Sequence, residues 1–172
     1  MQSGMWYVLK CPEGSETDYT EKYRKLAVPD GDGLQEVICF EYQRMMRYGG
    51  RWHLERRKLL PGWIFLAGAK DMEARDMASG RDEADDCRAD TAVSLIPCER
   101  PFVKALCRED NLIGMSRGVI REGKPVITSG PLKGRECLIR RINRHKRTAE
   151  IEIPLADTST RVTVGLEIYE KQ

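Results

Sequence analysis

The chain has few of the residues that build metal centres, and its cysteines lack the spacing of a zinc or redox site. Histidine occurs only as His53 and His145 in 172 residues, so a zinc site is not expected. None of the six cysteines is spaced as C-x-x-C, and no basic, apolar leader precedes them. A disulfide framework would be typical of a secreted protein. We therefore expect buried, reduced thiols in a cytoplasmic protein. The cysteines are Cys11, Cys39, Cys87, Cys98, Cys107 and Cys137.

Long apolar runs and catalytic signatures are also missing. No stretch approaches the roughly 20 consecutive apolar residues that span a membrane, so no membrane partner is expected. The sequence contains no P-loop, no G-x-G-x-x-G and no nucleophile elbow, which are the short motifs that most often indicate nucleotide or acyl chemistry. Neither an enzymatic activity nor a cofactor is therefore predicted.

Charge is abundant but nearly balanced, so its distribution indicates more than its sum. Lysine and arginine number 29 against 27 acidic residues, for a net charge of +2. Residues 71–90 hold eight acidic side chains against three arginines, whereas the region after residue 132 is basic. Such asymmetry indicates a localised binding surface. The acidic segment 71–90 carries few apolar groups and is expected to be mobile.

The C-terminal part reads as a set of short strands joined by turns. Val126–Ser129 is extended, residues 130–134 form a turn, and Cys137–Ile142 is a second strand. After a turn at 143–146, Thr148–Ile153 alternates apolar and acidic residues. Alternation with a period of two indicates a strand with one buried and one solvated face. The hydrophobic fraction of 41% supplies enough apolar surface for one domain or two small ones.

Positive charge is concentrated at the turns of this predicted sheet. Seven basic residues lie between positions 133 and 147, against a single acid, Glu136. The simplest interpretation is a solvated surface, because lysine and arginine are usually exposed. The alternative is RNA binding, in which these cations neutralise phosphates and a histidine stacks on a base. Loops and unpaired bases are the expected targets, because side chains cannot read the deep major groove of an RNA duplex. The candidate RNA-binding residues are Lys133, Arg135, Arg140, Arg141, Arg144, His145, Lys146 and Arg147.

The N-terminal part combines strands with one helix. Met5–Lys10 is an apolar and aromatic strand, and Ser15 is a plausible cap for a helix that places Tyr19, Tyr23 and Leu26 on one face. Val37–Tyr42 is predicted to be the second strand. These elements indicate a mixed sheet that is covered by a helix.

A basic hairpin follows this second strand. Gly49-Gly50 marks the turn, and Trp52–Lys58 is the next strand. The arginine-rich segment Arg44–Lys58 is interpreted as a solvated hairpin, with contact to nucleic acid as the alternative. Pro61-Gly62 then bends the chain into an aromatic strand that carries Trp63 and Phe65. If one face of this strand packs on helices, the other is an apolar groove that needs a partner.

Four segments resemble a known family. The turn Gly130-Pro-Leu-Lys-Gly134 after an extended Val-Ile run is similar to a KOW motif, which forms the core of a small SH3-like barrel. Leu60-Pro-Gly-Trp-Ile64 resembles the Phe-Pro-Gly-Tyr-Val segment of NusG N-terminal domains, with Leu60 and Trp63 as departures from it. Arg141–Arg147 and Val164–Glu170 look most similar to the specialised NusG paralogues of the LoaP type.

The resemblance implies an α+β fold with two domains. An N-terminal NusG-like domain, a mixed sheet with helices, would span residues 1–117 and be followed by a linker at 118–122. An SH3-like KOW β-barrel would occupy 123–172. By the same resemblance, the clamp helices of RNA polymerase would be bound by Tyr7, Leu60, Pro61, Gly62, Trp63 and Phe65.

The implied function is that of a monomeric transcription antitermination factor, which holds RNA polymerase with one domain and a structured element of nascent RNA with the other. Two alternatives stay open. One is a general NusG-like elongation factor whose KOW domain binds protein partners. The other is a ribosome-associated RNA-binding protein that uses the KOW fold.

Overall fold

The computed structural model describes residues 5–27, 33–68, 96–98, 101–155 and 157–172. The predicted α+β class is confirmed: strands dominate, and the described residues contain one α-helix. The chain divides into two compact units. The first comprises Met1–Cys39 and Pro61–Arg100, and the second comprises Phe40–Leu60 and Pro101–Gln172. The acidic segment 71–90, which was predicted to be mobile, lies outside the described residues.

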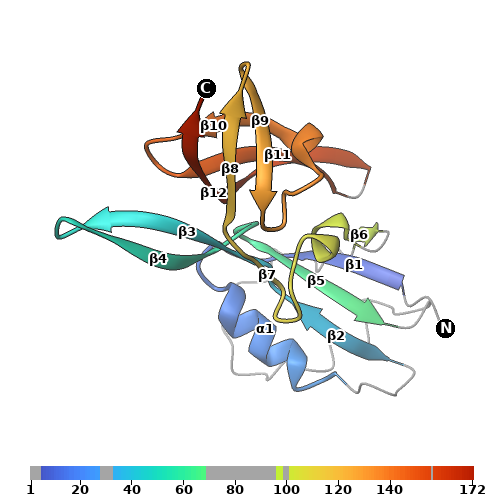
Figure 1. Ribbon diagram of the computed structural model, residues 1–172. Helices are drawn as coiled ribbons and strands as arrows, with labels where there is room; N and C mark the ends of the chain where they lie inside the picture. The colour runs from blue at the N-terminus through green and yellow to red at the C-terminus, as the bar shows by residue number, and fades with distance from the viewer. Residues whose placement is uncertain (1–4, 28–32, 69–95, 99–100, 156) are drawn as a thin grey trace. The chain divides into compact units, whose positions relative to one another are not determined.

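The first unit is built on an antiparallel sheet with the strand order β2-β5-β1-β6. Its strands are β1 (Met5–Lys10), β2 (Leu34–Ile38), β5 (Trp63–Gly68) and β6 (Ile96–Cys98). Helix α1 (Glu16–Arg24) packs on one face of the sheet (Figure 1). The core between helix and sheet consists of Tyr7, Leu9, Tyr23, Leu34, Val37, Ile64 and Leu66.

Helix α1 starts where the sequence predicts but is shorter than its apolar pattern suggests. Ser15 occupies the N-cap position, yet its hydroxyl donates to the Pro12 carbonyl at 2.6 Å and not to the helix. Tyr23 is buried, whereas Leu26 lies beyond the end of the helix and is 39% exposed. The prediction that Leu26 shares the buried face is therefore wrong, because the helix ends before that turn is completed.

The predicted strand Val37–Tyr42 is two strands in two sheets. β2 ends at Ile38, and β3 (Glu41–Tyr48) begins only three residues later with different partners. Phe40 lies between the two strands, is 1% exposed, and accepts the backbone N–H of Leu59 at 2.9 Å. The sequence does not reveal this change of sheet, because the apolar run Val37–Phe40 continues through it and side chains on both sides of the break are buried.

The second unit begins with the predicted basic hairpin. β3 pairs with β4 (Arg51–Lys58) across the turn Gly49-Gly50, whose φ angles are 58° and 74°. Positive φ at both central residues is the geometry that favours a tight hairpin with glycine. A short strand, β7 (Leu112–Ile113), pairs in parallel with β3. A 3₁₀ turn, η1 (Phe102–Ala105), precedes β7.

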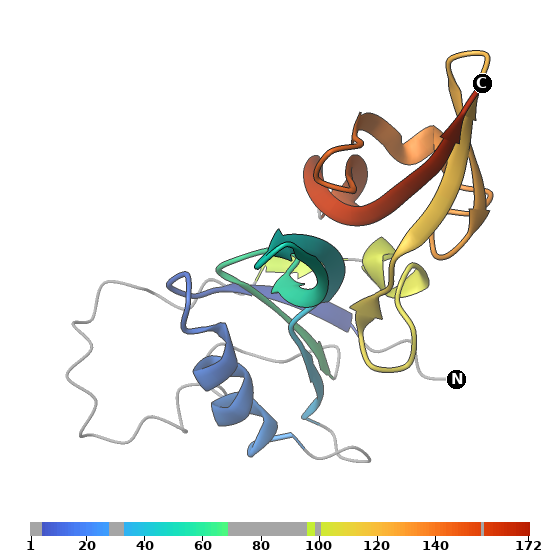
Figure 2. The same cartoon turned by 60° about the vertical axis from the view of Figure 1, so that its left-hand side comes forward.

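The larger sheet of the second unit has the order β10-β11-β12-β8-β9. Its members are β8 (Ser116–Arg121), β9 (Lys124–Ser129), β10 (Ile139–Asn143), β11 (Thr148–Leu155) and β12 (Thr158–Lys171). The long strand β12 pairs antiparallel with β11 through one half and parallel with β8 through the other. It bends strongly along its length (Figure 2).

The alternation predicted for Thr148–Ile153 is confirmed. Ala149, Ile151 and Ile153 of β11 are buried, and Glu150 and Glu152 are not. Other apolar groups of the second unit are also completely buried, which gives the unit its own core. Those groups are Leu132, Val164 and Leu166.

Two local predictions need correction. Cys137 and Leu138 were assigned to a strand but form a 3₁₀ turn, η2 (Glu136–Leu138), ahead of β10. The Glu136 carboxylate accepts the N–H groups of Ile127 at 3.1 Å and Gly134 at 3.3 Å, which holds the chain in a turn. Residues 118–121 of the predicted linker lie in β8, where they pair with β9 and β12. The domain boundaries themselves stay a prediction.

Candidate nucleic-acid interface

The β10–β11 turn presents several of the predicted RNA-binding side chains. Its shape is fixed by the Asn143 side-chain oxygen, which accepts the Lys146 N–H at 2.9 Å, and by a 3.3 Å bond from the Arg147 N–H to the Arg144 carbonyl. Arg147 adopts a φ of 51°, which is uncommon for a residue with a side chain. Arg144, His145 and Lys146 are exposed. The turn is therefore held by hydrogen bonds of its backbone, and its charged side chains extend into solvent.

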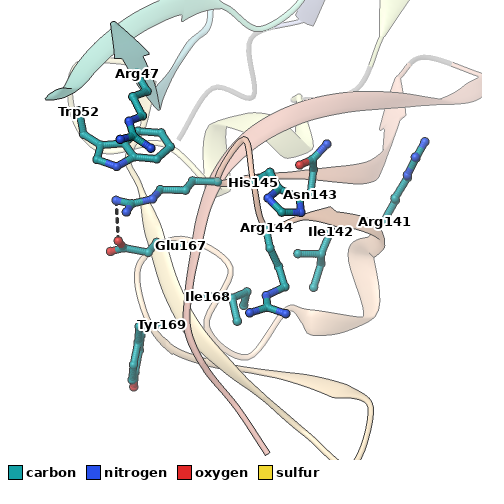
Figure 3. A pocket seen from close by; sticks show the side chains of 11 residues that line it. Arg47, Trp52, Arg141, Ile142, Asn143, Arg144, His145, Glu167, Ile168 and Tyr169 are labelled. Carbon is teal, nitrogen blue, oxygen red and sulfur yellow. Dashed lines mark ion pairs between the residues drawn. The ribbon is translucent and has the colours of Figure 1, made fainter. Parts of the chain in front are cut away.

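A cavity of about 860 Å³ lies beside this turn (Figure 3). It brings together three segments that are far apart in the sequence: the β3–β4 hairpin, residues 141–147, and residues 167–169 of β12. Most of its polar lining is cationic or aromatic. The lining residues are Arg47, Trp52, Arg141, Ile142, Asn143, Arg144, His145, Arg147, Glu167, Ile168 and Tyr169.

One wall of the cavity is an arginine that is held between an aromatic ring and a carboxylate. The Arg147 guanidinium carbon lies 3.9 Å from the centre of the Trp52 ring, within the range of a cation–π contact. Its Nη1 also forms a 2.8 Å ion pair with Glu167 Oε1, drawn as a dashed line in Figure 3. The other oxygen of Glu167 accepts from Arg117 Nε at 3.0 Å. The single carboxylate of the cavity is thus engaged by two arginines.

The cavity lining holds three further arginines. Among the residues that the structure describes, Arg47, Arg141 and Arg144 form no ion pair. All three are exposed. Four arginines therefore face one glutamate across the lining. Guanidinium groups that line one cavity attract anions, and their planar donors fit phosphate oxygens.

Four of the eight predicted RNA-binding residues do not line the cavity. Lys133 and Arg135 lie near the 130–134 turn, where Arg135 Nη1 donates to the Pro131 carbonyl at 3.1 Å. Arg140 pairs with Glu152 at 2.7 Å. Hydrogen bonding from Arg140 is the main cause that lowers the pKa of the Glu152 carboxyl. Lys146 is exposed outside the cavity lining.

The structure adds residues that sequence reasoning missed. Arg47 and Trp52 pair across the β3–β4 hairpin and point to the same side of it. Tyr169 of β12 also lines the cavity. The basic run Arg44–Lys58 had suggested nucleic acid as an alternative, but its arginines alone did not indicate which face matters. The position of Arg47 directly opposite Trp52 on either side of a Gly-Gly turn was the available signal.

Gly165 allows the hairpin to approach the larger sheet. A Cβ atom at this position would overlap the Met115 sulfur and the Gln43 backbone carbonyl. Gln43 belongs to β3 and Gly165 to β12. The absence of a side chain at residue 165 is therefore what lets the strand that carries Arg47 lie close to the strand that carries Glu167 and Tyr169.

Two of the predicted polymerase-binding residues lie on different faces of the sheet in the first unit. Tyr7 pairs with Leu66 across β1 and β5, and so it faces the α1 core. Phe65 pairs with Val8 on the opposite face and is 0% exposed. Tyr7 and Phe65 therefore lie on opposite faces of the sheet, because successive strand residues point to opposite faces. Trp63 is partly exposed.

The Pro61-Gly62 turn is anchored by a carboxylate from α1. Glu16 is 3% exposed, and it accepts the N–H groups of Gly62 at 2.6 Å and Gly14 at 2.9 Å. Gly62 has a φ of 78°, a conformation that favours glycine. Pro61 is exposed. Leu60 is 9% exposed and belongs to the other compact unit.

The described residues hold no group of three or more metal-ligating side chains. Among the cysteines in the described part, Cys11, Cys39 and Cys107 are half-buried thiols that form no disulfide there, whereas Cys137 is exposed. The expectation of burial is therefore wrong for Cys137, which lies on the η2 turn. Burial, followed by the nearby Asp110, raises the pKa of the Cys107 thiol to about 12.

Within the described part of the chain, no helix has the length and apolar character needed to cross a membrane. Comparison of the sequence with protein-family models and with curated proteins gives no match.

Proposed function

We propose that this protein is a transcription antitermination or elongation factor of the NusG kind, which binds RNA through the cavity beside the β10–β11 turn. The observation that supports RNA binding best is the set of three arginines without ion-pair partners in the described residues, Arg47, Arg141 and Arg144, around an aromatic lining. Phosphate neutralisation by arginine supplies affinity, and aromatic rings supply stacking for unpaired bases. No catalytic step is needed for such a role.

The proposed architecture follows from the resemblance in the sequence. The strongly bent sheet that contains the Gly130–Gly134 turn would be the KOW barrel, and the helix-covered sheet of the first unit would be the NusG-like domain. In this arrangement, Leu132 is fully buried and its N–H donates to the Ser116 hydroxyl at 3.1 Å. A buried leucine at the centre of the turn agrees with a structural role for that motif.

The proposed mechanism is tethering. One part of the chain would hold RNA polymerase, with Trp63 and the Pro61-Gly62 turn as the candidate contact, and the other would hold a structured element of the nascent RNA. Linking two binding events in one chain raises the effective concentration of the second partner. The factor would thereby stay with the elongating complex after the RNA element has been made. We place this activity in the cytoplasm.

The test compares two charge-matched double variants of the full chain in RNA mobility-shift assays. Arg141→Ala with Arg144→Ala removes two cations from the cavity. Arg121→Ala with Lys124→Ala removes two exposed cations from the β8–β9 turn, which does not line the cavity. We expect the first pair to weaken RNA binding strongly and the second pair to leave it almost unchanged, while thermal melts show both variants folded.

If both double variants lose the same amount of RNA affinity, the loss depends on net charge alone, and a localised site is contradicted. Binding to polymerase without any binding to RNA would replace the proposal by the alternative of a general elongation factor with protein partners. A polymerase pull-down from the same preparations separates these outcomes.

A further inference from the structure

We propose that the cavity takes one unpaired nucleotide of the RNA, whose base stacks on Trp52 in the place now held by the Arg147 guanidinium. This inference rests on the proposed RNA binding and adds the kind of RNA feature that is recognised. It also makes the site composite, because the stacking ring comes from the β3–β4 hairpin and the opposite wall from residues 141–147.

The Trp52 ring is already used as a platform for a flat group. The Arg147 guanidinium lies over it at 3.9 Å, and a nucleobase is also planar with a polarisable face. Proteins that bind unpaired nucleotides stack bases on aromatic rings in this manner. The cavity volume of about 860 Å³ falls in the range of small-ligand pockets, which is about 300–1,000 Å³. Such a volume can hold a nucleotide.

When Arg147 leaves Trp52, the carboxylate of Glu167 still has a partner. Glu167 is bonded through one oxygen to Arg147 at 2.8 Å and through the other to Arg117 at 3.0 Å. When the base displaces Arg147, the bond to Arg117 remains, so the cost of an isolated charge is avoided. The released guanidinium is then free to meet the phosphate of the incoming nucleotide. Free and bound states would each keep the ring of Trp52 covered.

The cavity lining also holds cations that could contact the phosphates on either side of the unpaired nucleotide. Arg47 lies on the hairpin beside Trp52, and Arg141 and Arg144 project from β10 and its turn (Figure 3). None of these three has an ion-pair partner among the described residues. The lining therefore offers an aromatic ring for base stacking and guanidinium groups for phosphate contacts.

The experiment uses the full chain and two RNA stem-loops of equal charge. One carries a single bulged adenosine, and the other carries an abasic ribose at the same position. The parent protein is expected to bind the bulged adenosine roughly 5- to 150-fold more tightly, as base stacking is worth about 1–3 kcal/mol. Trp52→Ala should lower binding of the bulged RNA to the abasic level and leave the abasic RNA unaffected. Trp52→Phe should retain most of the preference.

Tyr48→Ala is the matched control. Tyr48 is an exposed aromatic residue of the same hairpin that stacks on His53 at 3.7 Å and does not line the cavity. Its removal should preserve the preference for the base.

Each other outcome overturns the inference in a distinguishable way. If the parent binds both RNAs equally well, base stacking is refuted while RNA binding stands. If the parent binds neither RNA at low salt, the proposed function fails as well. A folded Trp52→Ala variant that keeps the preference refutes the role of Trp52. Should that variant unfold, the ratio measured on the parent and on Trp52→Phe still decides the question.

Discussion

Replacing Glu16 by alanine should destabilise the first unit much more than an ordinary surface substitution. The Glu16 side chain is 3% exposed, and its two oxygens separately accept the N–H groups of Gly62 at 2.6 Å and Gly14 at 2.9 Å. It therefore joins the N-terminus of α1 to the turn before β5. Alanine would leave both donors without this acceptor, and the Gly62 N–H would be left in a buried environment.

The magnitude follows from the two hydrogen bonds. A bond to a charged group contributes about 1.5–3 kcal/mol, and so two of them give about 3–6 kcal/mol. The Gly14 N–H is only partly buried, and water can replace its lost acceptor, which favours the lower half of that range. Domains are typically stable by about 5–15 kcal/mol, so the loss should be a large part of the total.

Urea denaturation of the full chain measures this effect, with Asp18→Ala as the matched control. Asp18 is also an acid in the first turn of α1 but is exposed, so it offers only its interaction with the helix dipole, about 0.3–1 kcal/mol. Glu16→Gln, which keeps one acceptor oxygen, should fall between the parent and Glu16→Ala. Equal destabilisation by Glu16→Ala and Asp18→Ala would refute the bridging role and leave a helix-dipole effect.

Three further predictions concern single positions. Gly165→Val should weaken RNA binding and lower the melting temperature, because its side chain would overlap Met115 and push the hairpin away; an unchanged melting curve would contradict this. Backbone hydrogen bonds, with its own N–H first, lower the pKa of the Glu136 carboxyl. Its contribution to stability is thus present above the ordinary carboxyl pKa of about 4.3 and is lost as the pH falls through the lower folded value. The parent should exceed Glu136→Gln in stability at neutral pH, and the difference should vanish in acid. Thiol alkylation at neutral pH should modify exposed Cys137 well before Cys107, whose pKa of about 12 keeps it protonated; the reverse order would be inconsistent with the structure.

Local periodicity in the sequence predicted the strands whose faces differ in polarity. β11 alternates apolar and acidic residues, and the structure buries the apolar set. The break at Cys39-Phe40 was not predictable in the same way, because the apolar run Val37–Phe40 continues through it. Sheet membership there depends on partner strands distant in sequence, β5 for β2 and β4 for β3.

The candidate site shows the same limit of sequence reasoning. The cationic turn residues Arg141, Arg144 and Arg147 were predicted, since charge density is visible in a short window. Trp52 was not, because its approach to Arg147 joins segments almost a hundred residues apart. The bridging role of Glu16 was not predicted either, since nothing near it in the sequence indicates that Gly62 would be its partner.

The central claim is that the arginines of the cavity bind RNA phosphates, and the salt dependence of RNA affinity tests it most directly. For a single strand, the slope of log affinity against log salt is about −0.7 for each phosphate neutralised. Removing Arg141 and Arg144 together should therefore make the slope shallower by about 1.4. Removing Arg121 and Lys124, which lie outside the cavity lining, should leave the slope at the parent value. A parent slope near zero, or the same change in both double variants, would contradict the account.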